Sequence, residues 1–253
     1  MNNTNSTFDF AQKVALIAGG TGGLGSALAT ELRSRGCIVA TVSRTPNTDP
    51  NHIAADLRSP ESATAVIDEV ITKHGALNIV INAMGVVAFG EISATTIDTV
   101  EEVFLTNTFG HIFLMQAALS KISQGSVLVG ISGVIAEQNL PGMSVYGASK
   151  SAVRSFDEAL AREARKAGVR VIDARPPHTE TGLASRAVAG TAPKFPRGLE
   201  PVAVAQRIIT AIANGETDLP STAFLTKHQT KKGWLSRSPT TLIKNLIKKL
   251  LSF

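Results

Sequence analysis

Residues 13–25 have the sequence KVALIAGGTGGLG, an apolar run followed at once by a glycine-rich loop. The run from Lys13 to Ala18 is typical of a strand buried on both faces, and residues 26–35 continue with a helical pattern that ends at Gly36. In this order, glycines let the main chain approach a pyrophosphate, and the amides at the helix N-terminus face its negative charge. The stretch therefore predicts a dinucleotide-binding unit, with a plain tight turn as the alternative for the loop taken alone.

The spacing of the glycines fits two templates. Gly20, Gly22 and Gly25 match the general Rossmann fingerprint, G-x-G-x-x-G. Gly19, Gly23 and Gly25 match a variant with a wider first spacing. Both templates predict that this loop holds the phosphates of the ligand.

The second expected strand, residues 37–42, ends in Ser43 and Arg44. An acidic residue at this place accepts hydrogen bonds from the adenosine ribose and suits NAD. A guanidinium can instead pair with a 2′-phosphate. Arg44 therefore favours NADP over NAD, with an ordinary exposed loop arginine as the alternative.

Strands and helices alternate through the rest of the chain. Further strands are expected at residues 51–55, 77–81, 126–131, 169–174 and 218–224, and helices at 60–73, 97–119, 146–166 and 201–213. This order predicts an α/β protein with a single doubly wound Rossmann-type parallel sheet flanked by helices. Ligands of such sheets bind beyond the carboxyl ends of the strands, so the glycine loop, Asn82, Ser132 and Pro176 should meet at one edge.

Tyr146 and Lys150 lie four residues apart in an expected helix and should share one face. A nearby ammonium favours the phenolate, and a phenol tuned in this way can give a proton to a carbonyl oxygen or take one from an alcohol. Tyr146 is the only tyrosine of the chain. The alternative is a surface tyrosine beside a chance lysine.

Together these residues resemble the short-chain dehydrogenase/reductase family over roughly residues 12–225. The resemblance rests on the glycine loop, Asp56-Leu57, Asn82-Ala83-Met84-Gly85, Asn107, Tyr146 with Lys150, and residues 176–181. It implies a Rossmann-type fold, an NAD(P) cofactor and usually a dimer or tetramer. It also implies hydride transfer between the nicotinamide and a carbonyl or alcohol carbon.

The resemblance assigns roles to single residues. Tyr146 would be the general acid/base, Lys150 would lower its pKa and bind the nicotinamide ribose, and Asn107 would hold a water in the proton relay. Asn82 would stabilise the central strands, and Thr181 would hold the carboxamide. The expected cofactor-binding residues are Gly19, Thr21, Gly23, Leu24, Gly25, Ser43, Arg44, Asp56, Leu57, Asn82, Ala83, Gly85, Tyr146, Lys150, Pro176 and Thr181.

One departure concerns the catalytic serine that the family places thirteen residues before the tyrosine. Gly133 occupies that position, and glycine has no hydroxyl to orient the substrate oxygen. Ser132 is the first candidate replacement, although neighbouring side chains on a strand face opposite ways. Ser144, a backbone amide or a water are the others. Loss of one such donor typically costs about 10²–10³ in rate, so Gly133 bears on substrate activation more than on cofactor binding.

Two further departures are smaller or lie near the substrate. Ala18 replaces a threonine of the family pattern, and Pro177 replaces a glycine. His178, next along the chain, would bind an anionic group or assist proton transfer, with a solvent-facing loop histidine as the alternative. Residues 183–199 are expected to form a lid over the substrate, and their Ala, Val and Leu content suggests a small apolar molecule.

The sequence therefore predicts an NADP-dependent oxidoreductase that interconverts a carbonyl and an alcohol. A regulatory or scaffold protein that binds the cofactor with weak or lost turnover is the alternative, motivated by Gly133. No metal site is expected.

The net charge of +5 is concentrated at the C-terminus. Residues 227–253 hold seven Lys and Arg and no Asp or Glu, so residues 1–226 carry −2 and give no indication of nucleic-acid binding. From Ser238 onward the pattern predicts a basic amphipathic helix that packs on the body or another subunit, or lies on a membrane surface. We expect an oxidoreductase domain over residues 1–226 and a helical tail over 227–253.

The single cysteine, Cys37, excludes an internal disulfide framework and fits a reducing compartment. The N-terminus lacks a signal-peptide pattern, and no apolar run reaches the ~18 residues of a spanning helix. These features predict a cytoplasmic protein, with peripheral membrane contact through the tail as an option.

Overall fold

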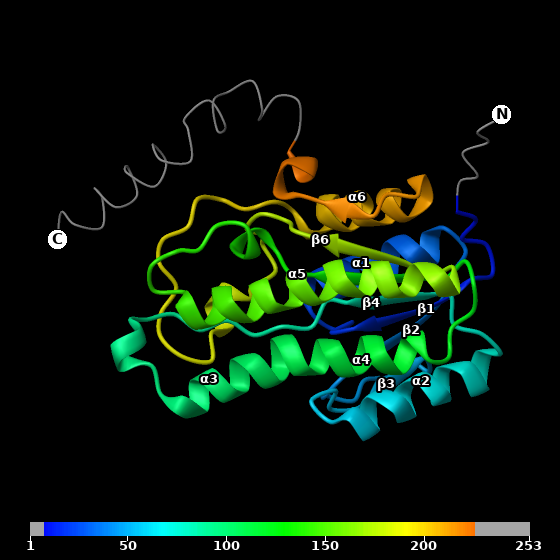
Figure 1. The fold of residues 1–253 in the computed structure, drawn as a ribbon, viewed down its shortest axis with the longest axis horizontal. Helices are drawn as coiled ribbons and strands as arrows, with labels where there is room; N and C mark the ends of the chain where they lie inside the picture. The colour runs from blue at the N-terminus through cyan, green and yellow to red at the C-terminus, as the bar shows by residue number, and fades with distance from the viewer. Residues whose placement is uncertain (1–7, 226–253) are drawn as a thin grey trace.

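Seven parallel strands form the central sheet of the computed structural model, which describes residues 8–225 (Figure 1). The order of the strands is β3-β2-β1-β4-β5-β6-β7. Their bounds are β1 Val14–Ala18, β2 Ile38–Ser43, β3 His52–Ala54, β4 Ile79–Asn82, β5 Val127–Ile131, β6 Arg170–Ala174 and β7 Asp218–Leu219. The predicted doubly wound parallel sheet is thereby confirmed.

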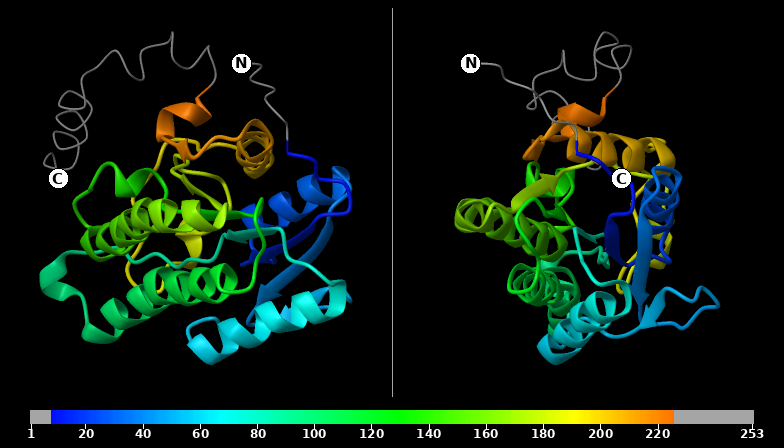
Figure 2. Two further views of the ribbon diagram at one scale, coloured as in Figure 1. Left: turned by 45° about the vertical axis from the view of Figure 1, so that its right-hand side comes forward. Right: turned by 90° about the vertical axis from the view of Figure 1, so that its right-hand side faces the viewer.

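Helices cover both faces of this sheet (Figure 2). The α-helices are α1 Gly23–Ser34, α2 Pro60–His74, α3 Ile97–Phe104, α4 Gly110–Leu119, α5 Ser144–Ala164 and α6 Pro201–Asn214. Helices α1 and α6 pack on one face, and α2, α4 and α5 on the other. Short 3-10 turns are η1 Ile92–Ala94, η3 Val134–Ala136, η4 Arg165–Ala167, η5 Ala184–Arg186 and η6 Ser221–Phe224.

Strand β1 shows why the sequence 13–18 is apolar throughout. Ala15 and Ile17 pack toward α1 and α6, whereas Leu16 and Ala18 pack toward α2 and α4. All five residues of β1 are buried. A strand covered on both faces needs apolar side chains at every position, which explains the absence of alternation.

The position of β1 also locates the binding edge of the sheet. Ala18, its last residue, pairs with Val42 of β2 on one side and with Asn82 of β4 on the other. The chain runs from β1 to β2 and β3 in one direction and returns to β4 in the other. Such a reversal opens a crevice at the carboxyl ends of the strands, where ligands of this architecture bind.

The structure corrects three expected elements. The helix expected at 97–119 is interrupted by the π-helical turn η2, Leu105–Phe109. The strand expected at 218–224 ends at Leu219, because Pro220 has no N–H to continue the ladder, and η6 follows. The strand expected at 51–55 is limited to three residues at the edge of the sheet.

The predicted tail, residues 227–253, lies outside the described residues. Within residues 8–225, no helix combines the length and hydrophobicity needed to span a membrane.

Candidate active site

The glycine loop lies directly against the chain that follows β4. Gly19 has φ +74°, and a Cβ there would lie 2.9 Å from the main-chain atoms of Ala83 and Met84. A Cβ on Gly23 would lie 2.9 Å from Cα of Thr181. These approaches are possible only without side chains, so the predicted loop, the segment after β4 and Thr181 meet at one place.

The N-terminus of α1 faces the same place. Its N-cap is Gly22, and no side chain caps the helix, so the amides of the first turn are available to an anion. Leu24 packs on the hydrophobic core beneath. A Cβ on Gly25 would overlap the carbonyl oxygen of Gly19, so this glycine lets the helix pack against the loop. The geometry fits a bound pyrophosphate.

Arg44 is exposed and directly follows β2. Its Nη1 lies 3.9 Å from Oε1 of Glu102, and its side chain is 60% exposed, so the guanidinium is free to contact a ligand. Ser43, in contrast, donates its hydroxyl to the carbonyl of Thr45 and contacts His52. Of the two residues, Arg44 is the one available to a phosphate.

Asp56 is held by Arg58, a residue that the sequence analysis did not single out. The guanidinium of Arg58 donates to Asp56 at 2.6–3.0 Å and also reaches Glu102 at 2.5 Å. The hydrogen bond from Arg58 is the main reason why the pKa of Asp56 is lowered. Leu57 is buried, 2% exposed, beside them. Arg58 and Arg44 therefore share Glu102 at the expected adenosine side of the site.

Lys150 connects α5 with the end of β5 and lies close to Gly85, in the segment after β4. Its ammonium donates to the carbonyl of Ile131 at 2.8 Å, and the side chain is buried. A Cβ on Gly85 would lie 3.5 Å from Nζ of Lys150 and 3.2 Å from Oδ1 of Asn107. The structure thus brings together Gly85, Asn107 and Lys150.

The π-helical turn η2 directs Asn107 inward. The Oδ1 of Asn107 accepts from the amide of Val86, and its Nδ2 donates to the carbonyl of Val86 and to Oγ of Ser149. Such turns are frequent at functional sites. The sequence holds one indication of this turn: Asn107 lies between Thr106 and Thr108, and all three residues are mediocre helix formers.

Burial dominates the titration of the Tyr146 hydroxyl. It raises the pKa of Tyr146 to about 12, and Lys150 is not among the causes. Burial also lowers the pKa of Lys150 to about 8, against the opposing charges of Asp173 and Asp157. The expected lowering of the Tyr146 pKa by Lys150 is therefore not what the structure shows, and Tyr146 is a protonated donor near neutral pH.

Ser132 was the first candidate to replace the catalytic serine, but its side chain points into the protein and not toward the site. Its hydroxyl is fully buried and donates to Oδ1 of Asp173 at 2.6 Å. Asp173 is in turn held at 2.5 Å by the buried guanidinium of Arg175. Ser132 is therefore part of a polar cluster inside the protein, which corrects its expected role as the replacement donor.

Gly133 adopts a backbone conformation that only glycine enters readily, with φ +78° and ψ 165°. Its amide donates to the carbonyl of Ala174 at 3.2 Å, and the amide of Val134 donates to that of Pro176 at 3.0 Å. Two backbone amides near the missing serine are thus already used. Ser144, the first residue of α5, is exposed and remains a candidate donor, as does a water.

Arg175 is the centre of a cluster that the sequence analysis did not find. Besides Asp173, it pairs with Glu137 at 2.5 Å and with Asp218 at 2.6 Å. Glu137 also accepts a hydrogen bond from Ser221. These contacts tie the segment after Gly133 to β6 and β7.

The expected lid, residues 183–199, lies over Tyr146. The amide of Phe89 donates to the carbonyl of Ala189, and that of Val188 to Val87, both at 2.9 Å. Tyr146 packs within an apolar cluster formed from both sides of this closure, whose other members are Val87, Phe89, Ile135, Leu140, Met143, Leu183, Ala184, Ala187, Ala192 and Phe195. The phenol therefore lies in an apolar environment beneath the segment.

His178 lies at the edge of this cluster. Its ring centroid is 5.0 Å from that of Phe195, and its Nε2 lies 3.6 Å from Glu180. The histidine is 35% exposed and close to an acidic residue, so it is poorly placed to attract an anion.

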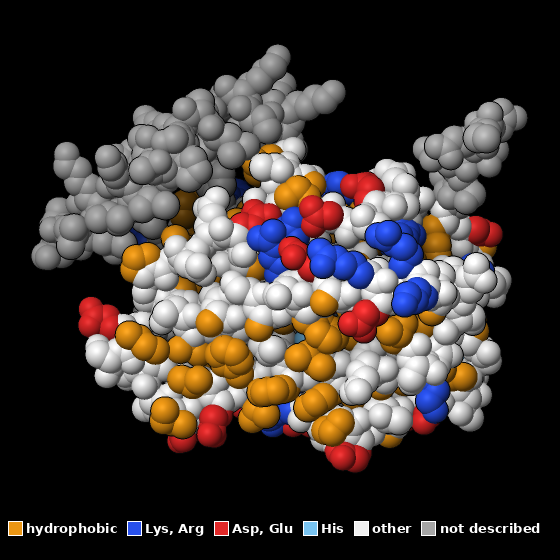
Figure 3. Space-filling model, viewed as in Figure 1, with side chains coloured by type: hydrophobic (Ala, Val, Ile, Leu, Met, Phe, Trp, Pro, Cys, Tyr) orange, Lys and Arg blue, Asp and Glu red, His pale blue; other side chains and the backbone are white. Residues whose placement is uncertain are grey.

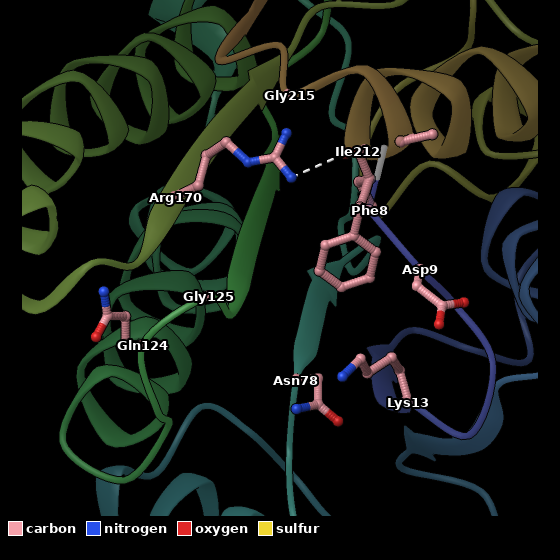
Figure 4. A pocket seen from close by; sticks show the side chains of 10 residues that line it. Phe8, Asp9, Lys13, Asn78, Gln124, Gly125, Arg170, Ile212 and Gly215 are labelled. Carbon is pink, nitrogen blue, oxygen red and sulfur yellow. Dashed lines mark hydrogen bonds between the residues drawn. The ribbon is translucent and has the colours of Figure 1, made fainter. Parts of the chain in front are cut away.

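A cleft of about 490 Å³ opens elsewhere, near the amino ends of the strands (Figure 4). Phe8, Lys13, Asn78 and Arg170 are among its lining residues, and none of the predicted site residues is. Arg170 donates to the carbonyl of Ile212 at 2.8 Å, near the end of α6. This cleft is separate from the candidate active site. Among the described residues, no group of three or more His, Cys, Asp or Glu side chains is arranged to hold a metal ion.

The fold and these contacts define the class of protein: an α/β oxidoreductase with a dinucleotide crevice and a tyrosine–lysine pair. The family model for short chain dehydrogenases matches residues 13–191. The chain belongs to the short-chain dehydrogenase/reductase family, whose members act on CH–OH and C=O groups.

Relatives of known sequence agree with this assignment. A dehydrogenase/reductase SDR family protein 7-like of Anopheles gambiae is 30% identical, over 85% of this chain and 78% of that protein. A hydroxynaphthalene reductase of Aspergillus fumigatus is 28% identical, over 85% and 82%. The chain thus spans most of the length of both relatives.

The solved structures support the fold. A short chain dehydrogenase from Burkholderia cenocepacia in complex with NADP superposes with a TM-score of 0.73 at 22% identity, covering 86% of this chain and all of that one. Ligand-free aldohexose dehydrogenase of Thermoplasma acidophilum gives 0.72 at 22% identity, covering 87% and 92%.

Proposed function

We propose that the chain is an NADP(H)-dependent reductase that interconverts a carbonyl and an alcohol on a small apolar molecule. The observation that carries this proposal is the placement of Tyr146. Its hydroxyl keeps its proton because burial raises the pKa to about 12, and it lies in an apolar cluster one helical turn from Lys150. A protonated phenol in such an environment is suited to donate a proton to a substrate oxygen.

The residues of the chain divide the chemistry between them. When bound, the cofactor supplies the hydride that reaches the carbonyl carbon. Tyr146 gives its hydroxyl proton to the carbonyl oxygen, and Lys150, one turn further along α5, would hold the nicotinamide ribose. Ile131 fixes Nζ of Lys150, and Asn107 fixes the chain after β4, so both groups are positioned before the substrate arrives.

Arg44 supports NADP as the preferred cofactor. Its guanidinium is exposed and its only ion pair among the described residues is long, whereas Arg58 is fully engaged with Asp56 and Glu102. With Asp56 bound to Arg58, an exposed guanidinium is what a 2′-phosphate would meet. The complex of the related Burkholderia cenocepacia protein contains NADP, which agrees with this preference.

The apolar cluster around Tyr146 supports an apolar substrate. The rings of Phe89, after β4, and of Phe195, in the covering segment, lie 6.0 Å apart in the same cluster as Tyr146. Relatives include reductases named for hydroxynaphthalene and versicolorin. We therefore expect ketones with a hydrophobic body to be better substrates than charged ones.

Exposed hydrophobic side chains support a homo-oligomer. Leu105 and Phe109 are 38% and 44% exposed, and Phe109 stacks on Phe113 at 6.2 Å. Helix α4 contains no Asp, Glu, Lys or Arg. Figure 3 shows hydrophobic side chains gathered over α3 and α4. The part of this face formed by η2 and α4 has no Asp, Glu, Lys or Arg and fits a second copy of the chain, as a homodimer or within a homotetramer. The tail, residues 227–253, and a peripheral membrane contact through it stay predictions, as does the cytoplasmic location.

A panel of carbonyl compounds with NADPH tests the function, run beside Tyr146→Phe. The variant lacks only the hydroxyl, so we expect turnover to fall about 10²-fold or more while NADPH still binds. Ser144→Ala is the matched control for the alternative donor near the tyrosine. Unchanged turnover in Tyr146→Phe would eliminate the proposed acid, and binding without any turnover across the panel would favour a cofactor-binding regulator.

A further inference from the structure

Three buried polar side chains form a chain of hydrogen bonds behind the site. Asn82 at the end of β4, His111 on α4 and Asp157 on α5 are each 3% exposed or less. Nδ2 of Asn82 lies 3.0 Å from Nδ1 of His111, and Nε2 of His111 lies 2.7 Å from Oδ1 of Asp157. The reaction proposed above does not explain why these three side chains are linked in this way.

The direction of these hydrogen bonds is fixed from the Asn82 end. Oδ1 of Asn82 accepts from the amide of Met84 at 2.9 Å, so its NH₂ group must face His111. Nδ1 of His111 is then an acceptor, and its Nε2–H donates to Asp157. This arrangement leaves the imidazole uncharged, so His111 holds the carboxylate in place without neutralising it.

The second oxygen of Asp157 is buried and has no hydrogen-bond partner among residues 8–225. It lies against Gly130 of β5, where a Cβ would overlap it. Glycine at this position therefore provides the room for a carboxylate inside the protein. A buried carboxylate with one neutral donor is costly unless a positive charge compensates it.

Lys150 is a candidate for that positive charge. It precedes Asp157 by seven residues, two turns on the same face of α5. Its Nζ donates to the carbonyl of Ile131, the residue next to Gly130. The ammonium thus lies at Ile131 and the unpartnered carboxylate oxygen at Gly130, which are consecutive residues of β5.

Asp173 is the other acid near Lys150, and it is already paired. Its two oxygens bind Arg175 at 2.5 Å and Ser132 at 2.6 Å. Tyr146, one turn away on α5, keeps its proton, and His111 contacts Asp157 through Nε2. Of the two acids whose charge acts on Lys150, only Asp157 has a buried oxygen without a hydrogen-bond partner among the described residues.

We propose that Asp157 is a positioning residue for Lys150: its buried charge is the counter-ion that keeps this ammonium protonated, and Asn82 and His111 hold it at that place. The proposal rests on the proposed function only in giving Lys150 a reason to be charged. Burial alone lowers the pKa of Lys150, and Asp173 and Asp157 both oppose that effect and leave it at about 8. Without Asp157, Lys150 would lose its proton closer to neutral pH.

The test is an NMR titration of the full chain with ¹³C-labelled lysine, following the Cε signal of Lys150. Asp157→Asn keeps the size of the side chain and removes the charge. We expect it to lower the pKa of Lys150 by about one unit. Glu158→Gln is the matched control, because Glu158 is the next residue of α5 but faces outward and pairs with Arg154. The control should leave the pKa of Lys150 unchanged.

An unchanged pKa of Lys150 in a folded Asp157→Asn chain overturns the proposal, even if the variant is less stable. If that variant does not fold, the wild-type chain decides. The carboxyl ¹³C signal of Asp157 should then shift at the pH at which Lys150 loses its proton, and the absence of that shift overturns the proposal. Neither measurement needs a substrate or a cofactor, so a failure of the proposed reductase activity leaves this result standing, and the reverse also holds.

Discussion

Ser132, the residue after β5, donates its hydroxyl to Asp173 of the neighbouring strand β6 at 2.6 Å and has no exposed surface. Asp173 is held from its other oxygen by Arg175, so the serine completes a buried polar cluster. Within this family a hydroxyl near this place would be expected to meet the substrate. Here the serine that remains supports the sheet, and the position beside it is a glycine.

Ser132→Ala is expected to affect stability and not chemistry. The substitution removes one hydrogen bond from a buried carboxylate and should lower the free energy of unfolding by about 1–3 kcal/mol. Turnover per folded molecule should be unchanged, because the hydroxyl does not reach the site. Urea unfolding and kcat for one carbonyl substrate check both parts. A large fall in kcat with unchanged stability would contradict this prediction and show that Ser132 takes part in catalysis.

Gly133→Ser is expected to damage the protein although it restores the residue type of the family. The backbone at Gly133 has φ +78°, so any side chain is strained there by about 1–3 kcal/mol. Gly133→Ala should be destabilised to the same degree, because the cost comes from Cβ and not from the hydroxyl. Thermal unfolding of both variants measures this cost. A Gly133→Ser chain that is stable and faster than the wild type would show that the loop can adopt the usual conformation.

Arg44→Ala is expected to weaken NADPH binding selectively. The loss of a hydrogen bond to a charged group typically costs about 1.5–3 kcal/mol, or roughly 10- to 100-fold in Kd. NADH has no 2′-phosphate, so its affinity should change little. Arg33→Ala is the control, since Arg33 is similarly exposed but pairs with Asp49 away from the site. Cofactor fluorescence with both nucleotides checks the prediction, and an equal loss for NADH would contradict it.

Phe109→Glu is expected to break the proposed subunit contact. A charge in the exposed apolar face of η2 and α4 cannot be buried against a second copy without a large desolvation cost. The variant should elute as a monomer in size-exclusion chromatography with light scattering. Val202→Glu is the matched control, because Val202 is equally apolar and 58% exposed but lies on α6. A wild-type chain that is itself monomeric would contradict the contact.

The features that could be predicted from the sequence are those that depend on neighbours along the chain. The apolar run before Gly19 and the spacing of Tyr146 and Lys150 are of this kind, and they were enough for the sheet and the family. The partner of Ser132 lies 41 residues away, and the unusual backbone of Gly133 depends on carbonyls of β6 and the segment after it. Such contacts are set by tertiary packing, which no local pattern contains.

The same limit explains why the electrostatics of the site were predicted less well. The spacing of Tyr146 and Lys150 suggested a lowered phenol pKa, but the pKa depends on how deeply the hydroxyl is buried. Burial is a property of the apolar cluster contributed by the covering segment, residues 183–199, and by the segment after β4. Neither can be located from the spacing of two residues on one helix.

The buried ammonium of Lys150 should make stability rise with pH in the alkaline range. Its pKa falls from 10.5 in the unfolded chain to about 8 in the folded protein, so between these values the unfolded chain binds more protons. Stability then increases with pH, by about 3 kcal/mol over this window for this one group. Tyr146 and Cys37 act in the opposite direction, because burial raises their pKa values to about 12 and about 11, and their contributions are lost as the pH rises above about 10 and 9.

The contribution of Lys150 is therefore isolated as the difference between the wild type and Lys150→Met, in which the other two groups cancel. Urea unfolding across pH 8 to 10 should show this difference growing in favour of the wild type as the pH rises. Lys121→Met is the control, because Lys121 is exposed and pairs with Asp68 at the surface, and it should keep the wild-type pH dependence. If Lys150→Met follows the wild type in parallel across this range, the ammonium is not buried as its contacts imply.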